Sequence, residues 1–174
     1  MTNLKIRQAN KEDAALIAVL SRKTFYDTFA EFNTKEDMDI FMNEVFTMEA
    51  LEKESDDPVN IFLLAYDEHE AIGYVRMRKG EKPVEFGDDP ALEIARIYVD
   101  VSAIGKGAGG ALMQACINTA VEQQYKWIWL GVWEKNDRAI RFYTQWGFEK
   151  FGLHDFVLGH DVQTDLLMKK RLNS

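Results

Sequence analysis

A glycine-rich turn is the part of this sequence whose residue types most clearly suggest chemistry. Residues 105–110 read Gly-Lys-Gly-Ala-Gly-Gly, so four of six positions carry no side chain over the backbone N–H groups. An apolar strand is predicted over 92–99, and a helix from 107 adds partial positive charge at its start. Bare N–H groups at the start of a helix bind phosphate groups. The turn therefore predicts a site for a phosphate-bearing ligand.

Two other phosphate-binding patterns fit this turn less well. Gly105, Gly107 and Gly110 match the Gly-x-Gly-x-x-Gly pattern of dinucleotide-binding folds. There the glycines follow their strand almost at once, whereas residues 100–104 intervene here. Only 64 of the 174 residues follow Gly110, too few for the rest of a six-stranded parallel sheet. The Walker pattern fails because no Gly-Lys-Ser/Thr occurs. A connector without a ligand is disfavoured, since glycines at a helix start weaken a fold unless bare backbone is needed.

The pattern around the turn predicts one domain that mixes helices and strands. Side chains that cap helices occur at Asn10, Thr34, Thr47 and Asn136, each before apolar residues at helical spacing, and Gly147 suits the end of the last helix. Residues 60–66 and 71–78 predict a hairpin, and 80–90 predicts a loop. The remaining predicted elements are a helix over 107–123 and strands over 4–8, 92–99, 127–132, 149–157 and 162–170.

Composition and charge limit the partners of the chain. Its 174 residues suit one domain with a sizeable core, and the hydrophobic fraction of 47% is ordinary for a globular protein. The net charge of −8 disfavours nucleic acid and would attract cationic molecules, although acidity can also serve solubility alone. No signal peptide or membrane-spanning run is evident.

The lone cysteine and the histidines give little support for metal or thiol chemistry. Cys116 lies on the apolar stripe of the predicted 107–123 helix, so we expect a small buried side chain in a protein of the reducing cytoplasm. His69, His154 and His160 lack the spacing of metal ligands. The sequence therefore predicts no metal site.

The order of the predicted elements resembles a known enzyme superfamily. Residues 136–148 read Asn-x-x-Ala-x-x-Phe-Tyr-x-x-x-Gly-Phe and follow a strand, the glycine turn, a helix and a second strand. This arrangement resembles the GNAT superfamily of acetyl-CoA-dependent N-acetyltransferases. Segments 24–29, 127–136 and 163–168 also look like the PaiA-type bacterial polyamine acetyltransferases. Members of that branch acetylate spermidine and spermine, and it has been linked to repression of sporulation and protease genes.

The resemblance implies a fold and a set of contacts to the acetyl donor. The fold is α+β, with residues 1–174 forming a single domain around a mixed, mainly antiparallel twisted sheet of about seven strands. Helices flank this sheet, which is splayed at its central strand pair. Acetyl-CoA would be the co-substrate. Ile104 stands where the superfamily usually has Arg or Gln, so binding of the diphosphate of acetyl-CoA would depend on backbone N–H groups. The implied contacts are Ile97, Tyr98, Val99, Gly105, Lys106, Gly107, Ala108, Gly109, Gly110, Asn136 and Tyr143.

Two side chains are candidates for the proton transfers of acetyl transfer in a ternary complex. An alkylammonium must lose a proton before it attacks a thioester, which costs about 4–5 kcal/mol at neutral pH. Glu93 is the candidate base; period two places it on one strand face with Ala95, Ile97 and Val99, and places Arg96 and Tyr98 on the other. Tyr143 matches the Phe-Tyr position of the superfamily and is the candidate acid. The alternatives are an ion-paired Glu93 and a merely packed Tyr143.

The predicted first helices are expected to receive a small cationic amine, such as a polyamine. Carboxylates beside aromatic rings suit a cation. The candidate residues are Phe25, Tyr26, Asp27, Phe29 and Glu31. Acetylation of a protein N-terminus or lysine is an alternative, as is an acetyl-CoA-binding regulatory protein that affects transcription. We expect a cytoplasmic protein with no direct nucleic-acid or membrane partner, and a homodimer is left open.

Overall fold

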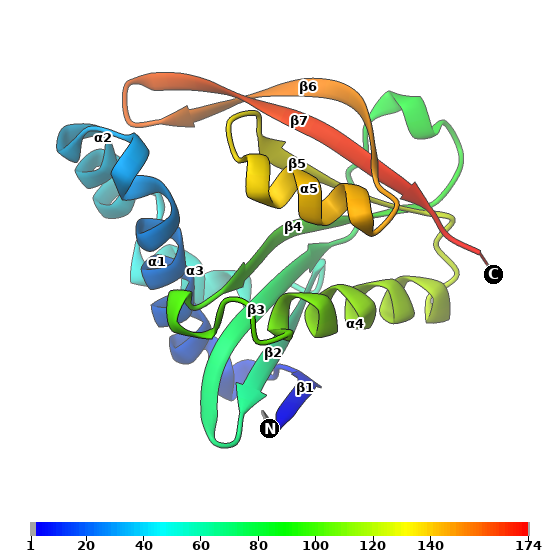
Figure 1. The fold of residues 1–174 in the computed structure, drawn as a ribbon, viewed down its shortest axis with the longest axis horizontal. Coiled ribbons are helices and arrows are strands. Elements are labelled where there is room, and N and C mark those ends of the chain that lie inside the picture. The colour runs from blue at the N-terminus through cyan, green and yellow to red at the C-terminus, as the bar shows by residue number, and fades with distance from the viewer. Residues whose placement is uncertain (1–2, 174) are drawn as a thin grey trace.

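A single mixed sheet forms the centre of the protein. The computed structural model describes residues 3–173, and in this range the sheet has the strand order β1-β2-β3-β4-β5-β7-β6 (Figure 1). Neighbouring strands are antiparallel except for the parallel pair β4 and β5. The predicted α+β fold is thereby confirmed. The strands are β1 (Leu4–Gln8), β2 (Asn60–Asp67), β3 (Glu70–Arg78), β4 (Ala91–Val99), β5 (Trp127–Trp133), β6 (Glu149–Leu158) and β7 (Asp161–Arg171).

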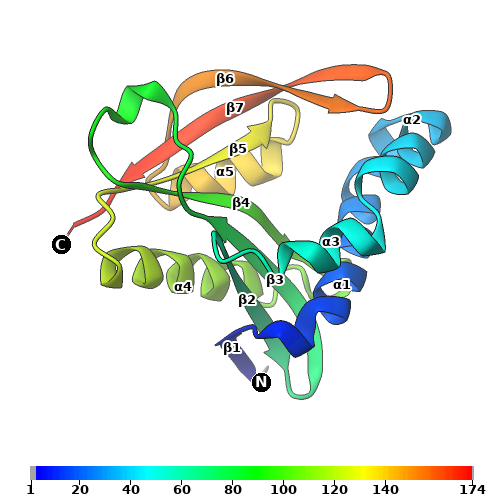
Figure 2. The same cartoon turned by 180° about the vertical axis from the view of Figure 1, so that it is seen from behind.

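Helices cover both faces of this sheet. The helices α1 (Ala14–Phe29), α2 (Lys35–Ile40) and α3 (Met48–Glu54) lie on one face, and a π-helical turn, Phe41–Val45, continues α2. The helices α4 (Ala108–Glu122) and α5 (Asp137–Gln145) lie on the other face. Figures 1 and 2 show the two groups on opposite sides of β4.

The predicted capping residues begin the helices as expected. The Asn10 side chain accepts a hydrogen bond from the Glu12 N–H and forms a capping box with Asp13. Thr34 and Thr47 accept from the N–H groups three residues further on, each at 3.1 Å. These local bonds satisfy N–H groups that a helix leaves without partners, which explains why the sequence alone located the helix starts.

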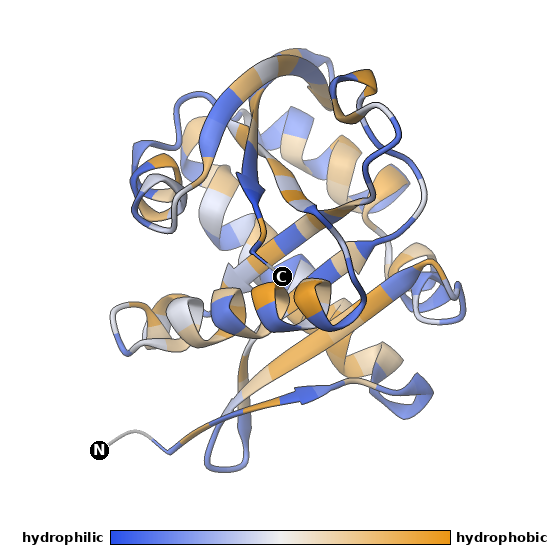
Figure 3. Cartoon of the chain, turned by 90° about the vertical axis from the view of Figure 1, so that its right-hand side faces the viewer, coloured by the Kyte–Doolittle hydropathy of each residue, from blue (hydrophilic) through white to orange (hydrophobic). Residues whose placement is uncertain are grey.

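Each face of the sheet has its own apolar core. Leu112, Met113 and Cys116 of α4 are fully buried against Val75, Met77 and Ile94 of the sheet. On the other face, aromatic side chains from α1 and the π-helical turn pack together, and the rings of Phe25 and Phe41 stack at 4.6 Å. Figure 3 shows that many residues of the strands between the helices are hydrophobic. The two cores hold β4 firmly from both sides.

The strands β4 and β5 pair over only part of their length. Their ladder runs from Ala91 opposite Trp127 to Ile94 opposite Leu130 and then ends. Both strands continue, β4 to Val99 and β5 to Trp133, while β5 stays paired with β7. The β5-facing edge of β4 therefore has no strand partner beyond Ile94, as expected for a splayed central pair.

A bulge in β4 overturns the predicted faces of that strand. Arg76 pairs with Arg96 and Met77 pairs with Ile94, so Ala95 is an extra residue in β4. An extra residue shifts the alternation of side chains by one position. The prediction that Glu93 shares a face with Ile97 and Val99 is therefore wrong. Glu93 shares its face with Arg96 and Tyr98, which is the face that α1 and α3 cover.

The turn between β6 and β7 is fastened to α2. Gly159 has a φ of +64°, and a Cβ at this position would lie 2.5 Å from the Asp37 Cα. The neighbouring His160 N–H donates a hydrogen bond to the Asp37 Oδ1 at 2.8 Å. Only glycine fits both the left-handed backbone and this close approach. The tip of the hairpin is thus fixed against the helices that cover the first face.

We expect the Gly73→Ala variant to lose about 2 kcal/mol of its free energy of unfolding because the added methyl overpacks the sheet. A Cβ on Gly73 would lie 2.9 Å from the Tyr98 carbonyl oxygen and 3.2 Å from the Leu112 Cδ1. The control is Gly152→Ala, whose Cβ would meet Leu167 at 3.4 Å. Urea unfolding measures both variants, and equal midpoints would contradict this account of the packing.

Candidate active site

A deep cavity opens where β4 and β5 separate. Its volume is about 930 Å³, and its wall combines side chains from both faces of the sheet. The glycine turn and α5 line one part, and α1, β3 and β7 line another. Since a closed sheet would separate these groups, the divergence of β4 from β5 is what joins them in one space.

The glycine turn presents unpaired N–H groups to this cavity. Gly105 and Gly107 have φ values of +84° and +91°, the left-handed region that favours glycine. Within residues 3–173, no protein acceptor pairs with the N–H groups of Gly105, Gly107, Ala108, Gly109 or Gly110. The last three belong to the first turn of α4, where the helix dipole adds positive potential. This arrangement suits an anion with several oxygen atoms.

The turn is held in place by Asp100. Its carboxylate accepts hydrogen bonds from the Ser102 N–H at 3.0 Å and the Ser102 hydroxyl at 2.7 Å. It also forms an ion pair with Lys23 of α1 at 2.8 Å. The Lys23 ammonium and the Ser102 donors lower the Asp100 pKa to about 2. The carboxylate therefore remains charged and tied to its donors at physiological pH.

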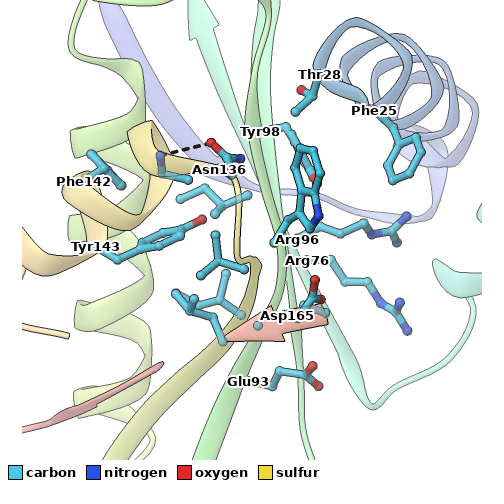
Figure 4. Close-up of a pocket in the computed structure, with 18 of the residues that line it drawn as sticks. Phe25, Thr28, Arg76, Glu93, Arg96, Tyr98, Asn136, Phe142, Tyr143 and Asp165 are labelled. Atoms are coloured by element: carbon cyan, nitrogen blue, oxygen red, sulfur yellow. Dashed lines mark hydrogen bonds between the residues drawn. The ribbon is translucent and has the colours of Figure 1, made fainter. Parts of the chain in front are cut away.

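The helix α5 brings its N-cap residue Asn136 and, near its C-terminal end, Tyr143 to the cavity wall. The Asn136 Oδ1 accepts from the Ala139 N–H at 3.2 Å, and no protein partner in the described range takes its amide N–H groups. Tyr143 is buried, which raises the pKa of its phenol. Figure 4 shows the Tyr143 hydroxyl directed toward the space between the two strands. A phenol that keeps its proton and has no protein partner can donate that proton to a bound group.

Charged side chains occupy the other side of the cavity. Glu93 is only 8% exposed, and its Oε2 accepts from the Arg78 Nε at 2.7 Å. The Glu54 carboxylate pairs with Arg96 and lies 3.3 Å from an Arg76 nitrogen. The predicted candidate base is thus buried and ion-paired at once.

The structure separates the predicted acceptor residues into two groups. Phe25 and Phe29 line the cavity, whereas Tyr26, Asp27 and Glu31 do not. Tyr26 is 50% exposed, and Asp27 pairs with Lys23 at 2.8 Å on the outside of α1. A helix presents one face to a neighbour, and residues 25 and 29 share the inward face. The remaining predicted contacts, Ile97, Tyr98 and Val99, line the cavity, while the side chains of Lys106 and Ala108 do not.

Several residues of the wall were not predicted as site residues. Arg138 of α5 lies two residues after the cap Asn136 and lines the cavity. Gln163, Asp165 and Leu167 are alternate residues of β7, and His154 lies opposite Asp165. The signal in the sequence is the pair of polar residues Gln163 and Asp165, which are two positions apart and therefore lie on one face of the strand. The sequence alone does not show that this face turns toward the cavity.

Residues 3–173 lack two features that mark other classes of protein. No helix there has the length and apolar character to cross a membrane. No three His, Cys, Asp or Glu side chains in that range come together as a metal site. Cys116 is fully buried as predicted, and burial raises the pKa of its thiol to about 12.

Comparison with known proteins assigns the family. The sequence profile described as the acetyltransferase (GNAT) family matches residues 22–148. The chain belongs to the GNAT acetyltransferase family. This match covers the splayed strands, the glycine turn and α5, which form much of the cavity wall, but not β7.

Individual relatives match this chain over nearly its whole length. It is 37% identical over 172 residues to an uncharacterized N-acetyltransferase of Lactobacillus delbrueckii subsp. lactis, covering 99% of each chain. The fold is shared with a PaiA N-acetyltransferase of Thermoplasma acidophilum solved with coenzyme A, with a TM-score of 0.76 and 20% identity over 97% of this chain and 99% of that chain. An N-acetyltransferase of Staphylococcus aureus gives a TM-score of 0.72 and 22% identity over 99% and 100%.

The ion pairs of Glu54 predict a measurable loss of stability in a Glu54→Gln variant. Removing its charge leaves the Arg76 and Arg96 guanidinium groups without their shared partner, and we expect the free energy of unfolding to fall by about 2 kcal/mol. The control is Glu49→Gln on the same helix, because its carboxylate is 81% exposed and its pair with Lys53 contributes little. Chemical denaturation compares the two, and equal stabilities would contradict a structural role for Glu54.

Proposed function

We propose that this chain is an acetyl-CoA-dependent N-acetyltransferase that acetylates a primary amine, with a polyamine such as spermidine or spermine as its acceptor. The observation that carries the proposal is the set of unpaired N–H groups in the glycine turn, which open onto the same cavity as Tyr143. The buried charged wall and the aromatic residues Phe25 and Phe29 provide a separate region for the acceptor.

The residues present fit acetyl-CoA as the acetyl donor. The donor, when bound, supplies an acetyl group activated as a thioester. The N–H groups of Gly105 and Gly107–Gly110 would hold its diphosphate, and Arg138 adds a positive charge on the same wall. The unpaired backbone edge of β4 at Ile97–Val99 would hold the thioester arm as an added strand, and the free Asn136 amide would contact it.

Within this proposal, Tyr143 donates the proton that the departing thiolate requires. Its hydroxyl faces the cavity and has no hydrogen-bond partner among residues 3–173, and burial keeps the phenol protonated because it raises the pKa. Exclusion of water from the cavity would also raise the basicity of a thiolate. Transfer of the phenol proton to sulfur therefore becomes favourable as negative charge develops on the sulfur.

Glu93 takes the proton from the amine through a bridging water in this scheme. Its Oε2 is held by Arg78, which leaves the second carboxylate oxygen, Oε1, to accept a proton. The backbone N–H groups on the free edge of β4 would stabilise the negative oxygen that forms during attack.

The state of the one cysteine supports direct transfer within a ternary complex. Cys116 is fully buried in the α4 core, and its raised pKa of about 12 keeps it a thiol, so it is no nucleophile for an acetyl-enzyme. Initial rates measured over a grid of acetyl-CoA and spermidine concentrations should give intersecting lines in a double-reciprocal plot. Parallel lines would indicate a covalent intermediate and contradict direct transfer.

We expect the Tyr143→Phe variant to lose about 100-fold in kcat with little change in KM for either substrate, because it removes the acid and keeps the ring. The assay is release of free coenzyme A with spermidine, spermine and a basic peptide as acceptors. The control, Tyr125→Phe, changes a phenol outside the cavity and should retain full activity. No turnover by the wild type on either polyamine would reject the proposed acceptor class.

For Glu93→Gln, the expected result is a loss of the acid limb of the kcat–pH profile together with a fall in kcat. Arg78→Lys is the companion variant, since it retains a positive charge beside Glu93 and separates loss of the ion pair from loss of the base. An unchanged profile in Glu93→Gln would remove this residue from the mechanism.

A further inference from the structure

Asp165 lies at the edge of the opening between β4 and β5. It is opposite Trp133 of β5 and His154 of β6. A Cβ built on Gly131 would lie 3.4 Å from the Asp165 Oδ2, so the carboxylate lies over Gly131. Gly131 is the first residue of β5 past the last pair with β4. Figure 4 shows Asp165 between the Glu93 side and the Arg96 side of the cavity.

The carboxylate of Asp165 differs from the other acidic groups that extend into this wall. Glu54 is neutralised by Arg76 and Arg96, and Glu93 is neutralised by Arg78. The Asp165 side chain, by contrast, forms no hydrogen bond or ion pair with any residue between 3 and 173. It is half-buried, and this burial raises its pKa. A partly desolvated carboxylate without a partner weakens a fold, which is characteristic of functional sites.

The groups around Asp165 suit a cation rather than a second anion. The aromatic residue Trp133 lies opposite Asp165 in the sheet, and its ring packs against that of Phe29 of α1 with the centroids 6.0 Å apart. Burial raises the pKa of Tyr98 on β4, and the nearby Asp165 charge raises it further, so this phenol stays neutral. His154 is the titratable group on β6, where a positive charge would lower the Asp165 pKa. A carboxylate among aromatic faces is the chemistry that binds an ammonium group.

We propose that Asp165 anchors the ammonium group of the acceptor over the opening between β4 and β5 and thereby restricts the acceptor to cationic amines. This inference rests on the proposed acetyl transfer and adds the residue that selects the acceptor. It assigns separate tasks to two carboxylates: Asp165 binds the cation, and Glu93 accepts its proton. The ion pair of Glu93 with Arg78 leaves it little net charge for attraction, whereas the charge of ionised Asp165 has no partner within residues 3–173.

The first test compares the steady-state kinetics of Asp165→Asn with those of the wild type, with spermidine as the acceptor. Loss of the anchor should raise KM for spermidine at least about 10-fold and leave kcat within about 3-fold, because only ground-state binding is removed. Asp165→Glu should recover part of the affinity. The matched control is Asp155→Asn, which makes the same change on β6 at a residue outside the cavity. An unchanged KM would overturn the assignment, as would a fall in kcat at constant KM, which would instead make Asp165 the base.

The pH dependence gives a second readout. The anchor binds a cation only when it is ionised, so kcat/KM for spermidine should fall as the pH drops through the pKa of Asp165 in the free enzyme. Because burial raises that pKa, the fall should lie above the range of an ordinary aspartate. The part of this fall that Asp165 causes should be absent in Asp165→Asn and persist in His154→Gln, whereas the fall caused by protonation of the base Glu93 should remain in both variants. If the first part instead followed His154, the anchor assignment would fail.

Calorimetry separates failure of this inference from failure of the proposed function. Spermidine is titrated into the wild type and into Asp165→Asn, each saturated with coenzyme A. Weaker binding in the variant supports the anchor whether or not turnover occurs, and equal binding, or no binding in either, overturns it. Absence of acetyl transfer to any amine by the wild type would instead reject the proposed function.

A thermal melt at neutral pH excludes a merely structural role. An acid whose pKa is raised by folding loses stability as the pH rises through that pKa, so Asp165 lowers stability at pH 7. Asp165→Asn should therefore melt at the same temperature as the wild type or higher. A lower melting temperature would indicate a structural carboxylate and contradict the proposal.

Discussion

The short ladder between β4 and β5 is the constraint on which the site depends. Four residue pairs join these strands before they diverge, although both strands continue for several residues. Backbone groups inside a sheet normally find partners in the next strand, so the free edge of β4 is costly unless water or a ligand satisfies it. Packing of the two apolar cores and the β5–β7 ladder offset this cost and hold the diverging strands in place. The gap is thus a permanent feature of the sheet.

The divergence also explains the distribution of chemistry around the cavity. Positive potential from the glycine turn and the start of α4 lies on one face. The carboxylates of Glu54 and Glu93 with their arginines, and the carboxylate of Asp165, lie on the other. An anionic donor and a cationic acceptor would therefore approach from opposite sides of the sheet. The two binding regions meet only along the edges of β4 and β5, which is where a group could pass between them.

Local signals in the sequence were sufficient to predict the elements of the fold. Helix caps such as Asn10 and Thr34 act through bonds to N–H groups two or three residues away, and the glycine turn acts through its own backbone, so no distant contact is needed to recognise them. Asn136 and Tyr143, which the resemblance in residues 136–148 implied as contacts of the acetyl donor, both line the cavity. The bulge at Ala95 gave no such signal, because a bulge depends on how β3 pairs with β4, and it reversed the expected face of Glu93. The partners of Glu93 and Glu54, and the lack of one for Asp165, likewise depend on contacts between strands and helices distant in the chain.

The fixed tip of the β6–β7 hairpin has a consequence for the polarity of the cavity wall. Gly159 and the hydrogen bond from His160 to Asp37 hold the turn against α2, six residues before Asp165. In a strand, sliding by a single residue exchanges the two sets of side chains. Such a slip would turn Asp165 outward and bring Thr164 and Leu166 inward in its place. Gly159, although far from the reacting groups, thus fixes the register of β7. A one-residue shift of β7 caused by an insertion in this turn would replace the Asp165 carboxylate in the cavity wall by the Thr164 hydroxyl and the Leu166 side chain.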